Sequence, residues 1–210
     1  LERVAAAAGT VILNADDEGA QSVVGQAAGA RILRYSAKGD AADIRALEVQ
    51  ATATGSQFIL DVADGGRSQV TLPLIGEFNV ANALCAAGAA LAAGLGLNEI
   101  VSALASTPGV PGRMSRVDAG QPFSVVVDYA HTPDSLEKVL KLLRGLHPGG
   151  RLIALFGSAG ERDVAKRPLQ GAVSARLADI TVVTSEDPRW EDAEAIVGQI
   201  AAGAREAGAR

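Results

Sequence analysis

The chain has 210 residues, of which 48% are hydrophobic and 20% are charged, and its formal net charge is −5. This length can form one large domain or two small ones, and the hydrophobic content excludes a disordered chain. One cysteine and two histidines exclude an internal disulfide framework and are too few ligands for an ordinary structural zinc site, while the acidic balance argues against a general nucleic-acid-binding protein.

The first half of the chain mixes short apolar runs with helical patterns. We expect strands at 11–14, 31–37 and 42–49, a helix over 18–29, a hairpin over 57–72, and helices over about 79–93 and 98–106. Asn98 is the expected N-cap of the last of these helices. The segment TPGVPGR (107–113) then contains two prolines and two glycines, which cannot continue a helix, so it predicts a domain boundary.

The second half is more regular than the first. Apolar runs of strand length at 123–128, 151–157 and 179–185 alternate with three helical patterns. Thr132 is the expected cap of the first helix, Pro168 is expected to open the second, and the third covers 191–207. This β-α-β-α-β-α order predicts an α/β domain with a parallel sheet.

Charged residues gather in the loops that directly follow these three strands. In open α/β sheets ligands bind outside the carboxyl ends of the strands, so these loops predict one binding edge. The first loop has no GxGxxG pattern, and the chain has no Gly-Lys-Ser or Gly-Lys-Thr, so a phosphate cradle for ATP would lie outside this sequence. The residues concerned are Asp128, His131, Asp134, Arg162, Asp163, Lys166, Arg167, Asp187 and Arg189.

Three further features concern location and extent. No run of 18 or more apolar residues occurs, and the N-terminal residues lack the basic and apolar regions of a signal peptide, so we expect a cytoplasmic protein without a membrane partner. The chain begins at Leu1 and its one methionine is Met114, so we expect it to be a piece of a longer protein.

Five ordered segments carry a more specific pattern. They are GEFNVANAL (76–84), PGVPGRMSRVDAG (108–120), DYAHTPDSLEKVL (128–140), FGSAGERDVAKRPLQG (156–171) and TSEDPR (184–189). Together they resemble the Mur ligases, and most closely the MurE-type branch, the tripeptide synthetases. The resemblance implies the C-terminal part of a P-loop-type central ATPase domain at 1–111, followed at 112–210 by a Rossmann-like C-terminal domain truncated at its end.

The resemblance also implies a reaction. ATP would phosphorylate the peptide carboxylate of UDP-MurNAc-L-Ala-D-Glu, and the amine of a diamino acid would attack the acyl phosphate. The cofactors implied are ATP and Mg²⁺, with the magnesium ligands, the GTxGKT loop and the UDP-sugar domain in missing segments of the same protein. No catalytic residue and no metal ligand is then expected in this chain, which we expect to be inactive alone.

The binding residues follow from the matched motifs. On the adenosine side the resemblance implies Asn79, Asn82, Arg113, Asp128 and His131. On the amino-acid side it implies Arg162, Lys166, Asp187 and Arg189. The chemistry of these residues is suitable, since an amide can meet an adenine edge and a guanidinium fork can meet a carboxylate.

Asp187 departs from the pattern of the diaminopimelate-adding branch, which has Asn at this position. If Arg189 points into the pocket, meso-diaminopimelate is favoured; if Arg189 pairs with Asp187 or Glu186, lysine or ornithine becomes acceptable. Trp190 is expected to pack against the protein. The alternatives are a MurT-like subunit, a cyanophycin synthetase-like enzyme or a non-catalytic nucleotide-binding domain.

Overall fold

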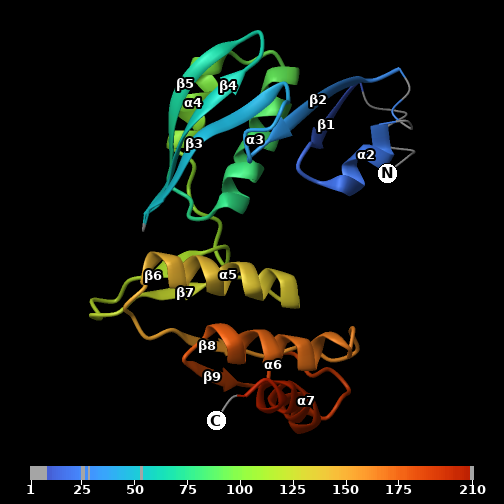
Figure 1. Cartoon of the computed structure of the whole chain (residues 1–210), viewed down its shortest axis with the longest axis vertical. Helices are drawn as coiled ribbons and strands as arrows, with labels where there is room; N and C mark the ends of the chain where they lie inside the picture. Colours follow the sequence, from blue (N-terminus) through green and yellow to red (C-terminus); the bar gives the residue numbers. More distant parts are fainter. Residues whose placement is uncertain (1–8, 25–26, 28, 53, 209–210) are drawn as a thin grey trace. The chain divides into compact units, whose positions relative to one another are not determined.

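The structure is a computed structural model that describes residues 9–24, 27, 29–52 and 54–208. The chain divides into two compact units, Leu1–Ser115 and Arg116–Arg210, each with its own helices and strands (Figure 1). The second unit is the one that carries the three predicted binding loops.

The first unit is built on a mixed sheet. Its strands lie side by side in chain order, with β1, β2 and β3 parallel and β3, β4 and β5 antiparallel. The predicted hairpin is confirmed as β4 and β5, whereas the helix predicted over 18–29 is described for Glu18–Val24, and 25–26 and 28 lie outside the described residues. The elements are β1 Thr10–Asn14, α2 Glu18–Val24, β2 Arg31–Ser36, β3 Ile44–Thr52, β4 Gly55–Val62 and β5 Gly66–Leu72.

Two helices follow the sheet of the first unit, α3 (Glu77–Ala92) and α4 (Leu97–Ala105). Helix α3 contacts β1, β2 and β3, and α4 contacts β5, so apolar side chains of both helices join the core of the sheet. The predicted cap at Asn98 is wrong, because α4 begins one residue earlier and the Gly96 N–H donates to the Glu99 carboxylate at 2.8 Å. An acidic side chain in the first turn therefore replaces the expected amide cap.

The second unit contains two short sheets and three helices among its described residues. Strands β8 and β9 are parallel, with Ile153 opposite Ile180. The expected single parallel sheet is wrong at its first strand, because β7 is hydrogen-bonded to β6, a strand that the sequence pattern did not indicate. The elements are β6 Ser115–Val117, β7 Val125–Val127, α5 Pro133–Leu146, β8 Ile153–Phe156, α6 Lys166–Leu177, β9 Ile180–Val183 and α7 Ala193–Glu206.

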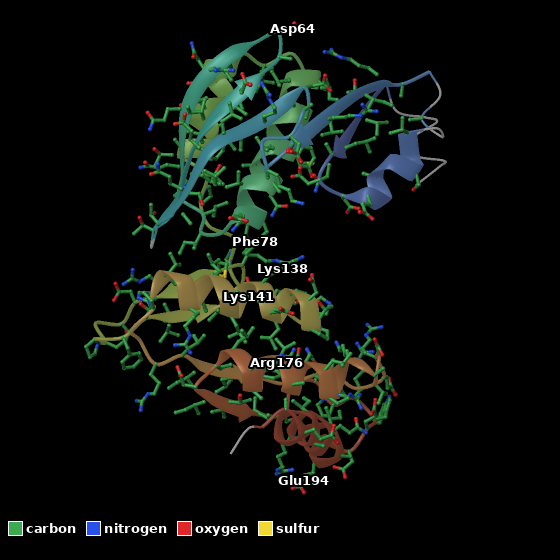
Figure 2. All side chains as sticks on the ribbon, viewed as in Figure 1. Asp64, Phe78, Lys138, Lys141, Arg176 and Glu194 are labelled. Carbon is green, nitrogen blue, oxygen red and sulfur yellow. The ribbon has the colours of Figure 1, made fainter. Side chains whose placement is uncertain are left out.

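Helix α5 is amphipathic as its sequence predicts. Thr132 is the N-cap, and its hydroxyl accepts a hydrogen bond from the Ser135 N–H at 3.2 Å. Leu136 and Leu140 are buried, and the exposed side carries the ion pair from Lys138 to Asp134, with Lys141 one turn further along (Figure 2). Together with the parallel strands of both units, the helices confirm the α/β class predicted from the sequence.

Helices α6 and α7 touch through glycines. A Cβ placed on Gly203 would lie 2.0 Å from the Pro168 carbonyl oxygen, and one on Gly171 would lie 2.0 Å from the Ile200 carbonyl oxygen. The two helix backbones therefore approach more closely than any larger residue allows at either position. This contact fixes the first turn of α6, which contains Pro168, against α7.

Candidate functional site

The loops after β8 and β9 lie against each other. The Gly160 N–H donates to the Asp187 carbonyl oxygen at 2.8 Å, and a Cβ on Gly160 would lie 2.0 Å from the Pro188 carbonyl oxygen. The Glu161 N–H donates to the Glu191 carboxylate. These two hydrogen bonds place the predicted Arg162 loop directly beside the predicted Asp187–Arg189 loop.

Both loops contain a non-glycine residue with left-handed backbone geometry. Glu161 has φ of 53° and Arg189 has φ of 51°. Such residues are uncommon and are maintained only where surrounding contacts impose the conformation. Here the imposing contacts are the hydrogen bonds of Gly160 and Glu161 to the neighbouring loop.

A buried arginine joins the same two loops to the helices behind them. Arg167, in the first turn of α6, is 1% exposed, and both its terminal nitrogens bond to the Glu191 carboxylate, at 2.8 and 2.9 Å. It also donates to the Gln199 side chain on α7 at 2.9 Å and to the Ala159 carbonyl oxygen at 3.4 Å. The Arg167 hydrogen bonds, followed by the Glu161 N–H, lower the pKa of Glu191 to about 2.

The loop after β7 is attached to the same turn of α6. The Lys166 ammonium donates to the His131 carbonyl oxygen at 3.0 Å, and the buried Gln170 amide donates to that oxygen at 3.1 Å. The His131 imidazole is exposed, lies edge-on to the Tyr129 ring at a centroid distance of 5.2 Å, and has Nδ1 3.1 Å from the Tyr129 carbonyl oxygen. One helical turn thus contacts all three predicted binding loops.

The predicted adenosine-side residues of the first unit differ in accessibility. Asn79 is buried, donates to the Ile75 carbonyl oxygen at 2.9 Å, and accepts from the Asn82 amide at 3.3 Å. Asn82 is exposed, so its side chain is the better placed of the two to meet an adenine edge. Arg113 is exposed, and its backbone N–H donates to the Val110 carbonyl oxygen at 2.9 Å.

Asp128 follows β7 in the second unit. It is half-buried, and one carboxylate oxygen accepts from the Ala130 N–H at 2.8 Å. This bond forms a local turn that fixes the carboxylate at the start of the loop that carries His131. A carboxylate fixed in this way can accept hydrogen bonds from hydroxyl groups of a ligand.

The predicted amino-acid-side residues are exposed or half-buried. Arg162, Asp187 and Arg189 are exposed, and Lys166 is half-buried. Arg189 Nε lies 3.4 Å from an Asp187 carboxylate oxygen, so these two charges form a loose pair. This is the arrangement in which the sequence argument makes lysine or ornithine acceptable beside diaminopimelate.

Two side chains near these loops differ from what the sequence suggested. Trp190 is 92% exposed, and the expectation that it packs against the protein is wrong. The sequence pattern groups Arg167 with the charged loop residues and indicates neither its burial nor its link to Glu191. The signal in the sequence is the charged pair Lys166-Arg167 directly before Pro168, a residue that suits the first turn of a helix.

Two negative findings apply to the described ranges, 9–24, 27, 29–52 and 54–208. No group of three or more His, Cys, Asp or Glu side chains there is arranged to hold a metal ion. No helix there has the length and apolar character needed to cross a membrane.

Comparison with known proteins identifies the family of this chain. The Mur ligase middle domain matches residues 2–90, and the Mur ligase glutamate ligase domain matches 112–209. The UDP-N-acetylmuramyl-tripeptide synthetase of Roseiflexus sp. (strain RS-1) is 47% identical over 95% of this chain and 39% of its own length. The UDP-N-acetylmuramoyl-L-alanyl-D-glutamate–2,6-diaminopimelate ligase of Trichormus variabilis is 42% identical over 93% of this chain and 39% of its own length.

A solved structure extends the comparison to the fold. The folylpolyglutamate synthase of Mycobacterium tuberculosis, crystallised with ADP and AMPPCP, has a TM-score of 0.76 at 24% identity, covering 93% of this chain and 43% of its own. The chain spans about two fifths of the length of the curated relatives above. With both domain models matched in order along the sequence, the chain belongs to the Mur ligase family.

Proposed function

We propose that the protein containing this chain is a cytoplasmic, ATP-dependent ligase of peptidoglycan precursor synthesis. It adds meso-diaminopimelate to UDP-MurNAc-L-Ala-D-Glu. The names of the two curated relatives support this reaction class. The observation that carries the proposal is the hydrogen bond between Gly160 and Asp187, which holds the Arg162 loop beside the Asp187–Arg189 loop.

The proposed reaction is an acyl transfer driven by phosphorylation. The carboxylate of the dipeptide takes the γ-phosphoryl group of ATP and releases ADP, and the amine then displaces phosphate from the acyl phosphate. Such a sequence depends on positioning and charge neutralisation rather than on a nucleophile of the protein. We assign the phosphate-binding loop and the ligands of Mg²⁺ to segments of the protein outside this chain.

The proposed nucleotide contacts lie on both units. Asn82, oriented by Asn79, and Arg113 belong to the first unit, while Asp128 and His131 belong to the second. The amide is suited to the adenine edge, and the carboxylate to the ribose hydroxyls. The attachment of the His131 carbonyl oxygen to α6 supports a fixed loop at that position.

The charges of Asp187 and Arg189 favour diaminopimelate over lysine or ornithine. Their loose pair uses Arg189 Nε, so the terminal guanidinium nitrogens take no part in it. The distal centre of diaminopimelate has both a carboxylate and an ammonium group, which match the guanidinium and the carboxylate respectively. Lysine and ornithine have only an ammonium group at this centre, so they offer no carboxylate to the terminal nitrogens of Arg189.

Kinetics of the full-length enzyme test the proposal. Wild type, Arg189→Ala and Asp187→Asn are assayed with diaminopimelate, lysine and ornithine at saturating ATP. Arg189→Ala should reduce the preference for diaminopimelate by more than about tenfold, which is about 1.4 kcal/mol. Asp187→Asn, which restores the residue of the diaminopimelate-adding motif, should keep that preference. A wild-type enzyme that prefers lysine or ornithine would refute the assignment.

A further inference from the structure

The guanidinium of Arg167 bonds to three separate parts of the second unit. Its acceptors are the Ala159 carbonyl oxygen in the loop after β8, Glu191 in the loop after β9, and Gln199 on α7. Its side chain is 1% exposed, whereas that of Glu191 is 32% exposed. The arginine is therefore inaccessible to a substrate and acts through the groups that it holds.

Glu191 joins the buried Arg167 to the loop after β8. One carboxylate oxygen accepts from Arg167 at 2.9 Å and from the Glu161 N–H, and the other accepts from Arg167 at 2.8 Å. The Glu161 N–H bond fixes the residue that precedes Arg162. Because Glu191 lies two residues after Arg189, a single carboxylate fixes both loops next to their exposed arginines.

We propose that Arg167 and Glu191 are positioning residues that set the spacing between the Arg162 loop and the Asp187–Arg189 loop, and so the affinity for the incoming amino acid. This inference rests on the proposed function for the identity of the ligand. Its structural part, the restraint of the two loops, rests on the hydrogen bonds alone. Neither residue is proposed to touch the substrate.

The bidentate geometry explains why an arginine is required here. A planar guanidinium can bond to both oxygens of a carboxylate while further N–H groups of its terminal nitrogens reach the Gln199 side chain and a backbone carbonyl. Lysine at this position would supply the charge without the fork. Glutamine at position 191 would keep the size but lose the charge and one acceptor.

A second ion pair in the same unit provides a matched control. Arg144 donates to Asp179 at 2.7 Å, and Asp179 also accepts from the Leu152 N–H at 2.7 Å. This pair likewise combines an arginine, a carboxylate and a backbone N–H. It lies beside the amino ends of β8 and β9, whereas the Arg167–Glu191 pair lies beyond their carboxyl ends.

The first test is hydrogen exchange, measured by mass spectrometry on the full-length protein. Glu191→Gln and Arg167→Lys should speed exchange in residues 157–165 and 184–192 about tenfold, as expected when a charge-assisted hydrogen bond is lost. Asp179→Asn should leave both segments unchanged. If both Glu191→Gln and Arg167→Lys exchange at the wild-type rate in these segments, the proposal is overturned, whatever the activity of the enzyme.

The second test separates positioning from general destabilisation. In the full-length enzyme, Glu191→Gln should raise the KM for diaminopimelate about tenfold or more while the KM for ATP changes less than about twofold. If Glu191→Gln changes both KM values equally and exchange is faster throughout the second unit, the pair has only a structural role and the proposal is overturned. If the two loops exchange faster but the wild type uses no diamino acid, the restraint stands and the proposed function fails.

Discussion

Two glycines of helix α7 should respond in opposite ways to the same substitution. Gly203 faces α6, where an added Cβ would lie 2.0 Å from the Pro168 carbonyl oxygen, whereas a Cβ on Gly198 would meet no atom within 4 Å beyond its chain neighbours and the nearby backbone of α7. Cβ atoms essentially never lie closer than 3.0 Å to another atom, so Gly203→Ala requires the helices to separate by about 1 Å, the difference between those distances.

The magnitude follows from packing and helix propensity. Overpacking of this kind costs up to about 3 kcal/mol, and alanine in a helix interior recovers about 1 kcal/mol relative to glycine. Gly203→Ala should therefore lose about 2 kcal/mol, while Gly198→Ala should gain up to about 1 kcal/mol. A difference of about 3 kcal/mol corresponds to roughly 12–24 °C in the Tm of a unit as small as Arg116–Arg210, because each kcal/mol shifts the Tm of such a domain by about 4–8 °C.

Thermal unfolding of the full-length protein measures this difference. Because Pro168 follows Lys166 and Arg167 directly, Gly203→Ala should also raise the KM for the amino acid. Gly198→Ala is the control for helix propensity and should leave that KM unchanged. Equal Tm values for the two variants would refute the close contact between α6 and α7.

Two further predictions concern pH and the nucleotide. The pKa of Glu191 is lowered from 4.5 to about 2, so its ion pair stabilises the folded protein above about pH 4.5 and this contribution is lost as the pH falls toward 2. The Tm difference between wild type and Glu191→Gln should accordingly be largest above pH 5 and shrink toward pH 2, and a difference that grows on acidification would contradict this sign. Asp128→Ala in the full-length enzyme should raise the KM for ATP several-fold, because one lost hydrogen bond costs about 0.5–1.5 kcal/mol. The KM for the amino acid should stay unchanged. If steady-state kinetics show a change only in the KM for the amino acid, the assignment of Asp128 to the nucleotide is reversed.

Local signals in the sequence predicted local structure well. The Thr132-Pro133 pair indicated the start of α5, and the Asp64-Gly65-Gly66 turn indicated the β4–β5 hairpin, because both depend on neighbouring residues. The cap of α4 was misplaced by two residues, since an asparagine and a nearby glutamate both suit a helix start and the glutamate supplies the hydrogen bond.

Features that depend on distant residues were not predictable in the same way. The composition of β7 fits a strand but does not specify its neighbour, and pairing with β6 is decided by tertiary contacts. The burial of Arg167 depends on Glu191, 24 residues later, and on Gln199, 32 residues later. The loops were expected to gather at one edge, but the role of α6 in fastening them is visible in the structure alone.

A competition experiment on the full-length enzyme tests the central claim most directly. The enzyme is incubated with UDP-MurNAc-L-Ala-D-Glu, ATP, Mg²⁺ and an equimolar mixture of meso-diaminopimelate, lysine and ornithine, and the nucleotide product is identified by mass spectrometry. Our account predicts the diaminopimelate adduct as the dominant product, formed with one ADP per amide bond. A dominant lysine or ornithine adduct, or amide formation without ADP, would contradict it.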